Sequence, residues 1–267
     1  MLETNSWIYL DLEKTGCTFL RKKLIGLFPD SEFTNTEKHM IQNFKSSRIK
    51  ILTIRDPFNY YFSLWSYGLE KRGGFYHQIN RINPSVCQKF YGEKNINSFE
   101  SFLDFALNHT ARYPFLYERW LPNGFDIYST RILSMLIPMD ERAKLAFKIK
   151  EINKISEFNK LIIDLYKPEI ILKTETLNSD FHYLVKKGMM NFLNLPTQWI
   201  EAFPISAKPI NSSNISSNLE DSNKKKFISK KYLDLIYKKS SISLELIKIR
   251  NDLICLLYTS PSPRDIG

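Results

Sequence analysis

The 267-residue chain is long enough to bury a complete core as one α/β domain, and its 43% hydrophobic residues suit a globular protein. Its formal net charge of +10 implies an anionic partner, which leaves open a nucleic acid, a membrane surface, a polyanionic cofactor or an acidic glycan. Three cysteines without paired spacing exclude a disulfide framework and a zinc site, and no apolar run is long enough to cross a membrane.

The first predicted elements are a buried strand, Trp7 to Leu12, and a helix that begins near Thr15. Residues 13–18, Glu-Lys-Thr-Gly-Cys-Thr, lie between them and supply a glycine, the N–H groups of a helix start, two hydroxyls and one lysine. These are the parts of a phosphate-binding loop, although an ordinary strand-to-helix turn with a capping Thr has the same outline. Lys14 precedes the single Gly16, so the loop is not a Walker A motif.

A second junction of the same kind follows the strand predicted from Ile49 to Ile54. This strand ends in Arg55, and Asp56 and Pro57 are typical of the N-cap and first position of a helix. Ser63 lies two turns along that helix, where its hydroxyl and the Arg55 side chain can hold one phosphate. The alternative is that Arg55 pairs at the surface with Asp56 or another carboxylate.

The rest of the chain alternates helices with one more strand. Residues 75–97 are polar and are expected to form a long substrate loop that contains His77. Helices are predicted over 98–108, 127–136 and 140–166, the last with a break near Asn159, and Ser179 is expected to cap another helix. The segment 169–173 is the third buried strand, so the order of elements predicts a parallel sheet.

Taken together, the Lys14-Thr-Gly-Cys-Thr18 loop and the Arg55-Asp-Pro…Ser63 pattern resemble the two signature segments of the sulfotransferase family. Similarity to bacterial and phage-type members extends over most of residues 1 to 250, in the blocks 37–40, 66–76, 171–181 and 211–213. The resemblance implies a P-loop-like three-layer α/β fold with a central parallel sheet and helices on both faces. It also implies a single domain over residues 1–254.

The resemblance further implies 3′-phosphoadenosine 5′-phosphosulfate (PAPS) as co-substrate, with transfer of its sulfuryl group to an acceptor hydroxyl on a glycan or small molecule. The expected contacts of the donor are Lys14, Thr15, Gly16, Cys17 and Thr18 at the 5′-phosphosulfate, Arg55 and Ser63 at the 3′-phosphate, and Lys208, Asn211 and Ser212 at a third segment. Lys14 is the expected catalytic cation, and no metal is expected. A P-loop kinase or NTPase and a non-catalytic basic anion-binding module are the alternatives.

A base must take the proton of the acceptor, and histidine is suited to this because its pKa of about 6.5 lies near neutral pH. His39 is the expected catalytic base, since its loop precedes the Arg55 strand and matches the position of the catalytic His of similar sulfotransferases. His77, Glu70 and Asp11 are the alternatives, whereas a structural role is expected for His109 and His182.

Two further expectations concern location and the end of the chain. The sequence contains no signal peptide, so a cytoplasmic enzyme of bacterial or phage origin is expected. A nucleic-acid partner is not favoured, because the lysines are spread over many segments. Residues 255–267 read as the translation of a common sequencing adapter, and they are therefore interpreted as non-native sequence.

Overall fold

The structure is a computed structural model that describes residues 1–27, 34–35, 48–107, 121, 125–149, 154–186 and 221–259. Within these residues it contains one sheet of five strands in the order β3-β1-β2-β4-β5. The strands are β1 (Leu2–Glu3), β2 (Trp7–Leu10), β3 (Thr34–Asn35), β4 (Ile49–Ile54) and β5 (Ile170–Lys173). β2, β4 and β5 are parallel, whereas β1 is antiparallel to both of its neighbours.

The register of the three parallel strands places their carboxyl ends at one edge of the sheet. Leu10 of β2 pairs with Leu52 of β4, and Ile54 at the end of β4 pairs with Lys173 at the end of β5. The segments that follow these strands therefore begin at the same edge. In open α/β sheets this edge is where ligands bind.

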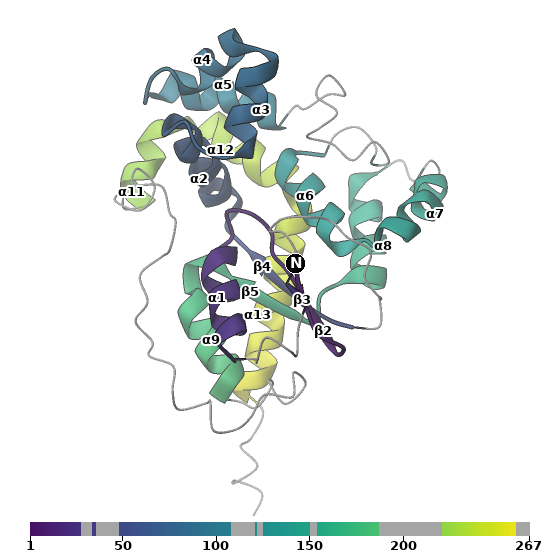
Figure 1. Cartoon of the computed structure of the whole chain (residues 1–267). Coiled ribbons are helices and arrows are strands. Elements are labelled where there is room, and N and C mark those ends of the chain that lie inside the picture. Colours follow the sequence, from purple (N-terminus) through teal and green to yellow (C-terminus); the bar gives the residue numbers. More distant parts are fainter. Residues whose placement is uncertain are drawn as a thin grey trace, which may run out of the picture.

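One face of the sheet is covered by α1 (Cys17–Leu27) and α9 (Leu177–Lys186), which lie side by side in Figure 1. Alternate side chains of a strand point to opposite faces, and one set of them packs here. This core contains Trp7 and Tyr9 of β2, which pack with Leu20 and Leu24 of α1 and with Phe181 of α9.

On the opposite face the long helix α13 (Ser241–Thr259) packs against β4 and β5. The helices that share its hydrophobic core are α2 (Pro57–Leu69), α5 (Ile96–Leu107), α6 (Ile127–Leu136) and α8 (Ile155–Tyr166). The other set of strand side chains, among them Ile8, Leu10, Leu52 and Ile54, packs against these helices. Helices thus lie on both faces of a mostly parallel sheet. The predicted three-layer α/β fold is confirmed.

The expectation of a long irregular loop over residues 75–97 is wrong. This segment forms α3 (Gly74–Ile82) and α4 (Pro84–Tyr91), and α4 packs on α5 in the helical region at the top of Figure 1. There α5 also contacts α12 (Lys230–Lys239). Each helix is mostly polar but buries a few apolar side chains, such as Phe75 and Ile79 of α3. The Asn83 side chain also caps α4 by accepting a hydrogen bond from the Val86 N–H at 3.2 Å.

Two predicted helix boundaries also differ. The helix predicted over 140–166 is divided into α7 (Met139–Ile149) and α8, and Asn159 lies inside α8 rather than at the break. Its buried Nδ2 donates to Ser241 Oγ at 2.7 Å, so the polar side chain marks a tertiary contact and not a helix end. Near the C-terminus, α11 (Asp221–Lys224) precedes α12, and α12 and α13 meet at Ser240.

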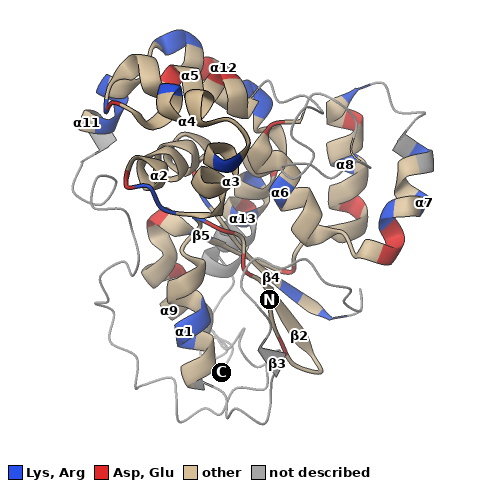
Figure 2. Ribbon diagram, turned by 45° about the horizontal axis from the view of Figure 1, so that its top comes forward, with Lys and Arg blue, Asp and Glu red and all other residues tan. Residues whose placement is uncertain are grey.

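The charged residues are distributed over many elements. Figure 2 shows Lys and Arg on α1, α7, α11 and α12, while Asp and Glu lie on α5, α7 and α8. The positive charge is therefore not confined to one helix. None of the helices in the described part of the chain is long and apolar enough to span a membrane.

Candidate anion-binding site

The loop between β2 and α1 has an unusual backbone. Lys14 and Gly16 have φ values of 61° and 82°, both in the left-handed region. The Gly16 carbonyl accepts hydrogen bonds from the Phe19 and Leu20 N–H groups at 3.0 and 3.2 Å, so Gly16 starts the helix. A Cβ added to Gly16 would lie 2.7 Å from Leu177 Cδ2. Both the conformation and the close approach of α9 therefore require glycine at this position.

The backbone N–H groups of this loop are available to a ligand. Within the described residues, those of Lys14, Thr15, Gly16 and Thr18 make no hydrogen bond. The first turn of α1 carries no acidic residue that could compensate the positive end of the helix. A group of N–H donors at a helix N-terminus is an arrangement that binds phosphate, sulfate or carboxylate.

Thr15 fastens the loop to the sheet. Its side chain is buried, and its hydroxyl donates to the Leu12 carbonyl at 2.7 Å. It also lies 2.7 Å from the Thr53 hydroxyl of β4, which in turn lies 3.0 Å from the Tyr9 hydroxyl. Of the two hydroxyls expected to face the ligand, that of Thr15 thus contacts the sheet. Thr18 is half-buried in the first turn of α1, and Cys17 beside it is buried.

Lys14 rests on an aromatic ring. Its Nζ lies 3.0 Å from the ring centroid of Tyr67, in the last turn of α2, and Arg72 Cζ lies 4.4 Å from the same centroid. The pKa of Lys14 is lowered to about 7, chiefly by burial. The thiol of Cys17 opposes this shift, while the nearby guanidinium groups of Arg55 and Arg72 contribute to it. Sequence reasoning did not predict that Tyr67 and Arg72 lie beside Lys14, because only the folded chain returns the end of α2 to the loop.

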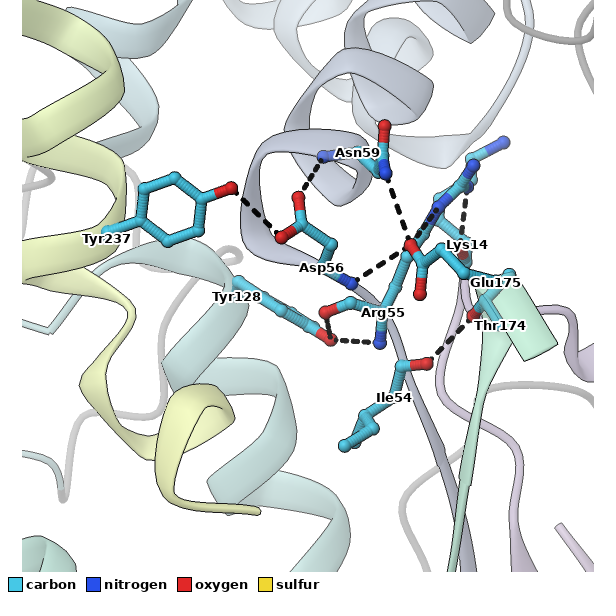
Figure 3. Close-up of polar contacts among 9 residues, drawn as sticks. All are labelled: Lys14, Ile54, Arg55, Asp56, Asn59, Tyr128, Thr174, Glu175 and Tyr237. Atoms are coloured by element: carbon cyan, nitrogen blue, oxygen red, sulfur yellow. Dashed lines mark hydrogen bonds and ion pairs between the residues drawn. The ribbon is translucent and has the colours of Figure 1, made fainter. Parts of the chain in front are cut away.

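Arg55 joins the two strand-to-helix junctions (Figure 3). Its Nη1 donates to the Lys14 carbonyl at 3.0 Å, and its Nε lies 3.9 Å from Glu175 Oε1. Its backbone is held as well, since the Arg55 N–H donates to the Tyr128 hydroxyl at 2.8 Å and that hydroxyl donates to the Arg55 carbonyl at 3.0 Å. The structure thus brings together Lys14 and Arg55, which are 41 residues apart.

The polar groups at the start of α2 find hydrogen-bond partners within the protein. Glu175 Oε1 accepts from the Asp56 N–H at 3.1 Å and from Asn59 Nδ2 at 3.3 Å. The Asp56 side chain accepts from the Asn59 N–H at 3.1 Å and from the Tyr237 hydroxyl at 2.9 Å. Arg55 therefore has a carboxylate partner, as the alternative interpretation required, but that partner is Glu175. Sequence reasoning assigned no binding role to Glu175, Tyr128 or Tyr237.

Ser63 follows two turns along α2. Its side chain is buried, with an exposed fraction of 6% for the residue, and its hydroxyl has no hydrogen-bond partner in the described part of the chain. Ser63 thus retains the hydrogen-bonding capacity that phosphate binding requires.

The described candidates for a base have different surroundings. Asp11 is completely buried and forms ion pairs with Arg21 Nη1 at 2.7 Å and with the Met1 amino group at 3.2 Å. Glu70 pairs with Arg72 at 3.1 Å. His77 is exposed on α3 beside the Tyr76 ring, so two of the three alternatives are engaged in ion pairs.

Several predicted residues lie outside the described residues. These are the expected base His39, the histidine His109 and the third donor segment with Lys208, Asn211 and Ser212. His182 is described and is half-buried on α9. The backbone of α13 continues to Thr259, through the first five residues of the segment interpreted as adapter sequence, and residues 260–267 are outside the described part.

A scan of protein-family models finds no match to the chain, and neither curated proteins nor solved structures give a significant match. Function is therefore inferred from the chemistry of the two junctions. The β2–α1 loop offers unfilled donors and one cation, and the β4–α2 junction offers a second cation that is fixed in place.

Proposed function

We propose that the chain is a sulfotransferase that uses PAPS as donor and transfers its sulfuryl group to an acceptor hydroxyl. The observation that carries this proposal is the hydrogen bond from Arg55 Nη1 to the Lys14 carbonyl at 3.0 Å. It means that two anion-binding segments, built on the neighbouring parallel strands β2 and β4, lie within the span of one ligand. PAPS carries an anionic group at each of two positions of its ribose, and such a ligand needs two separate sites.

The residues of the site suit each end of this donor. The N–H groups of the β2–α1 loop and the Lys14 ammonium would hold the 5′-phosphosulfate, because they are donors and a cation at a helix N-terminus. Glu13, the acidic residue of this loop, forms an ion pair with Arg131 of α6. Arg55 and Ser63 would hold the 3′-phosphate, with the guanidinium supplying charge and the buried hydroxyl a further donor.

The proposed reaction moves one group between two oxygens. The acceptor oxygen forms a bond to sulfur while the bond from sulfur to the phosphate oxygen breaks, and adenosine 3′,5′-bisphosphate leaves. The acceptor proton passes to a base, for which His39 is proposed. By analogy with phosphoryl transfer, negative charge gathers on the leaving oxygen. The Lys14 ammonium would stabilise that charge, and a lysine with a pKa of about 7 can also donate a proton to it.

A ligand panel tests the proposal against its alternatives. Thermal unfolding would be followed with adenosine 3′,5′-bisphosphate, with ATP plus Mg²⁺ and with a sulfated polysaccharide. We expect the bisphosphate to raise the melting temperature without Mg²⁺. Stabilisation by ATP plus Mg²⁺ alone would indicate a kinase or NTPase, and stabilisation by the polyanion alone would indicate a basic binding module. Either result would refute the proposed donor.

A second assay tests the transfer itself. The protein would be incubated with PAPS carrying labelled sulfur and a library of saccharides and small hydroxyl compounds, and labelled products would be identified by mass spectrometry. We expect a sulfated glycan or small molecule. His39→Ala should lower turnover by about 10²- to 10⁴-fold with donor affinity unchanged.

A further inference from the structure

A tight turn after α2 brings a third cation to the β2–α1 loop. The Lys71 N–H donates to the Gly68 carbonyl at 2.8 Å and the Arg72 N–H donates to the Tyr67 carbonyl at 3.1 Å, which folds residues 70–73 back over the end of the helix. Lys71 and Gly73 have φ values of 55° and 90°. A Cβ on Gly73 would lie 2.8 Å from the Tyr67 ring. The turn is thus built to keep its backbone close to this ring.

The Tyr67 ring positions two cations together. Lys14 Nζ and Arg72 Cζ lie 3.0 and 4.4 Å from its centroid, and both contacts are within the range of a cation–π interaction. Such contacts hold a cation but do not neutralise it. The two side chains come from segments more than fifty residues apart, so the ring is what brings their charges to one place.

Carboxylates balance the charge of this cluster only in part. Arg72 pairs with Glu70 at 3.1 Å, and Arg55 lies 3.9 Å from Glu175. Within the described residues, Lys14 has no carboxylate within ion-pair distance. The side chain of Arg72 is 45% exposed, so it can exchange Glu70 for a ligand without breaking the core. An anion bound at the loop would reduce the repulsion among the three cations.

We propose that Arg72 is a third ligand-binding cation of this site, positioned by Tyr67, and that it contacts the same anionic group as Lys14. That group must therefore carry more than one negative charge or more than one set of acceptor oxygens. This inference rests on the proposed function and assigns Arg72 to the 5′-phosphosulfate end of the donor. A guanidinium suits this role because it binds two oxygens at once.

Two nucleotides that differ in one phosphate test the assignment. Adenosine 3′,5′-bisphosphate carries both phosphates, whereas adenosine 3′-monophosphate lacks the one that Arg72 would contact. In calorimetry, Arg72→Ala should lower the affinity for the bisphosphate by about 10- to 100-fold, the usual effect of losing one charge-assisted hydrogen bond. It should leave the 3′-monophosphate unchanged. Arg81→Ala, at an exposed arginine of α3, is the matched control and should change neither affinity.

Variants of Tyr67 separate positioning from folding. Tyr67→Phe keeps the ring and should bind the bisphosphate as the wild type does, whereas Tyr67→Leu should reproduce most of the Arg72→Ala loss with an unchanged 3′-monophosphate affinity. If Arg72→Ala binds the bisphosphate normally while Arg55→Ala does not, the role of Arg72 is refuted and the donor site stands. If the wild type does not bind the bisphosphate, pyrophosphate becomes the probe. If the wild type binds pyrophosphate and Arg72→Ala weakens that binding, Arg72 is a ligand-binding cation of the site, but the ligand is not PAPS. If the wild type binds neither compound, both proposals are refuted.

Discussion

The two strand-to-helix junctions differ in whether the protein itself supplies hydrogen-bond partners for their polar groups. At the β4–α2 junction the protein does so itself, through the Tyr128 hydroxyl and the Glu175 and Asp56 carboxylates. At the β2–α1 junction the N–H groups of Lys14, Thr15, Gly16 and Thr18 have no partner in the described chain, and the Lys14 ammonium lies over the Tyr67 ring. One junction is complete before a ligand arrives, and the other is not.

This difference suggests a division of labour. The completed junction holds Arg55 in place, so that little ordering entropy would be lost on binding the proposed 3′-phosphate. In the same proposal the incomplete junction would keep its donors and its ammonium for the 5′-phosphosulfate. Substitutions that alter one junction at a time separate the two roles.

Arg55→Ala removes the cation of the completed junction and its link to the loop. We expect the affinity for adenosine 3′,5′-bisphosphate to fall by about 2 to 5 kcal/mol, the effect of losing a partly buried charged partner. Calorimetry measures this directly, with circular dichroism to show that the fold is intact. An unchanged affinity in a folded variant would refute the donor site.

Gly16→Ala alters the incomplete junction through its backbone. A side chain at φ 82° is strained, and its Cβ would lie 2.7 Å from Leu177, so we expect a loss of ~1 to 3 kcal/mol in the free energy of unfolding. Gly26→Ala in α1 is the control. Nothing lies within 4 Å of a Cβ at Gly26, and alanine favours a helix there. Equal effects of the two substitutions in urea unfolding would show that the loop tolerates side chains.

Tyr128→Phe alters the completed junction through one hydroxyl. It leaves the Arg55 N–H and carbonyl without their partner, and we expect a loss of ~1 to 2 kcal/mol in unfolding free energy. Tyr60 stacks on Tyr128 at 3.8 Å, and its buried hydroxyl has no partner in the described structure. Tyr60→Phe should therefore be neutral or slightly stabilising. If both variants lose the same stability, the hydroxyl of Tyr128 is not what holds the junction.

Lys14→Met tests how much folding stability is lost by burying the Lys14 ammonium at the β2–α1 junction. The pKa of Lys14 falls from 10.5 in its unperturbed state to about 7 in the folded protein, so the unfolded chain binds the extra proton between these values. Below pH 7 both states are charged and the burial cost is fully present, and wild-type stability rises from there toward pH 10. We expect the stability of the variant relative to the wild type to be greater at pH 6 than at pH 9, by ~1 kcal/mol or more. Urea unfolding at both values measures this. A difference that does not change with pH would show that Lys14 is not perturbed.

The sequence predicted the junctions better than their surroundings. The strand ending at Ile54, the capping role of Asp56 and the meeting of Lys14 with Arg55 follow from local patterns and from the geometry of parallel strands. The contacts of Glu175 and Tyr128 join residues 119 and 73 positions apart. No local pattern encodes such pairs, because they depend on how whole helices pack.

In the region after α2, local reasoning predicted a loop where the protein forms helices. Its polar composition indicated a loop, yet a few apolar side chains per helix are enough when a neighbouring core accepts them. Trp65 Nε1 donates to the Phe90 carbonyl at 2.8 Å, and Phe90 and Phe102 pack edge to face. Tertiary packing decided the structure here, as it does for many short amphipathic helices.

The last helices of the chain set the time at which the completed junction can form. Tyr237 of α12 bonds Asp56 across 181 positions, and Ser240 bonds the fully buried Asp126, which also accepts from Tyr61 at 2.7 Å. A ribosome delivers Asp56 181 residues before the Tyr237 hydroxyl that bonds it. Contacts so distant in sequence close late and slowly. The nascent chain therefore carries the residues proposed to bind phosphate before the last contacts of this junction can form.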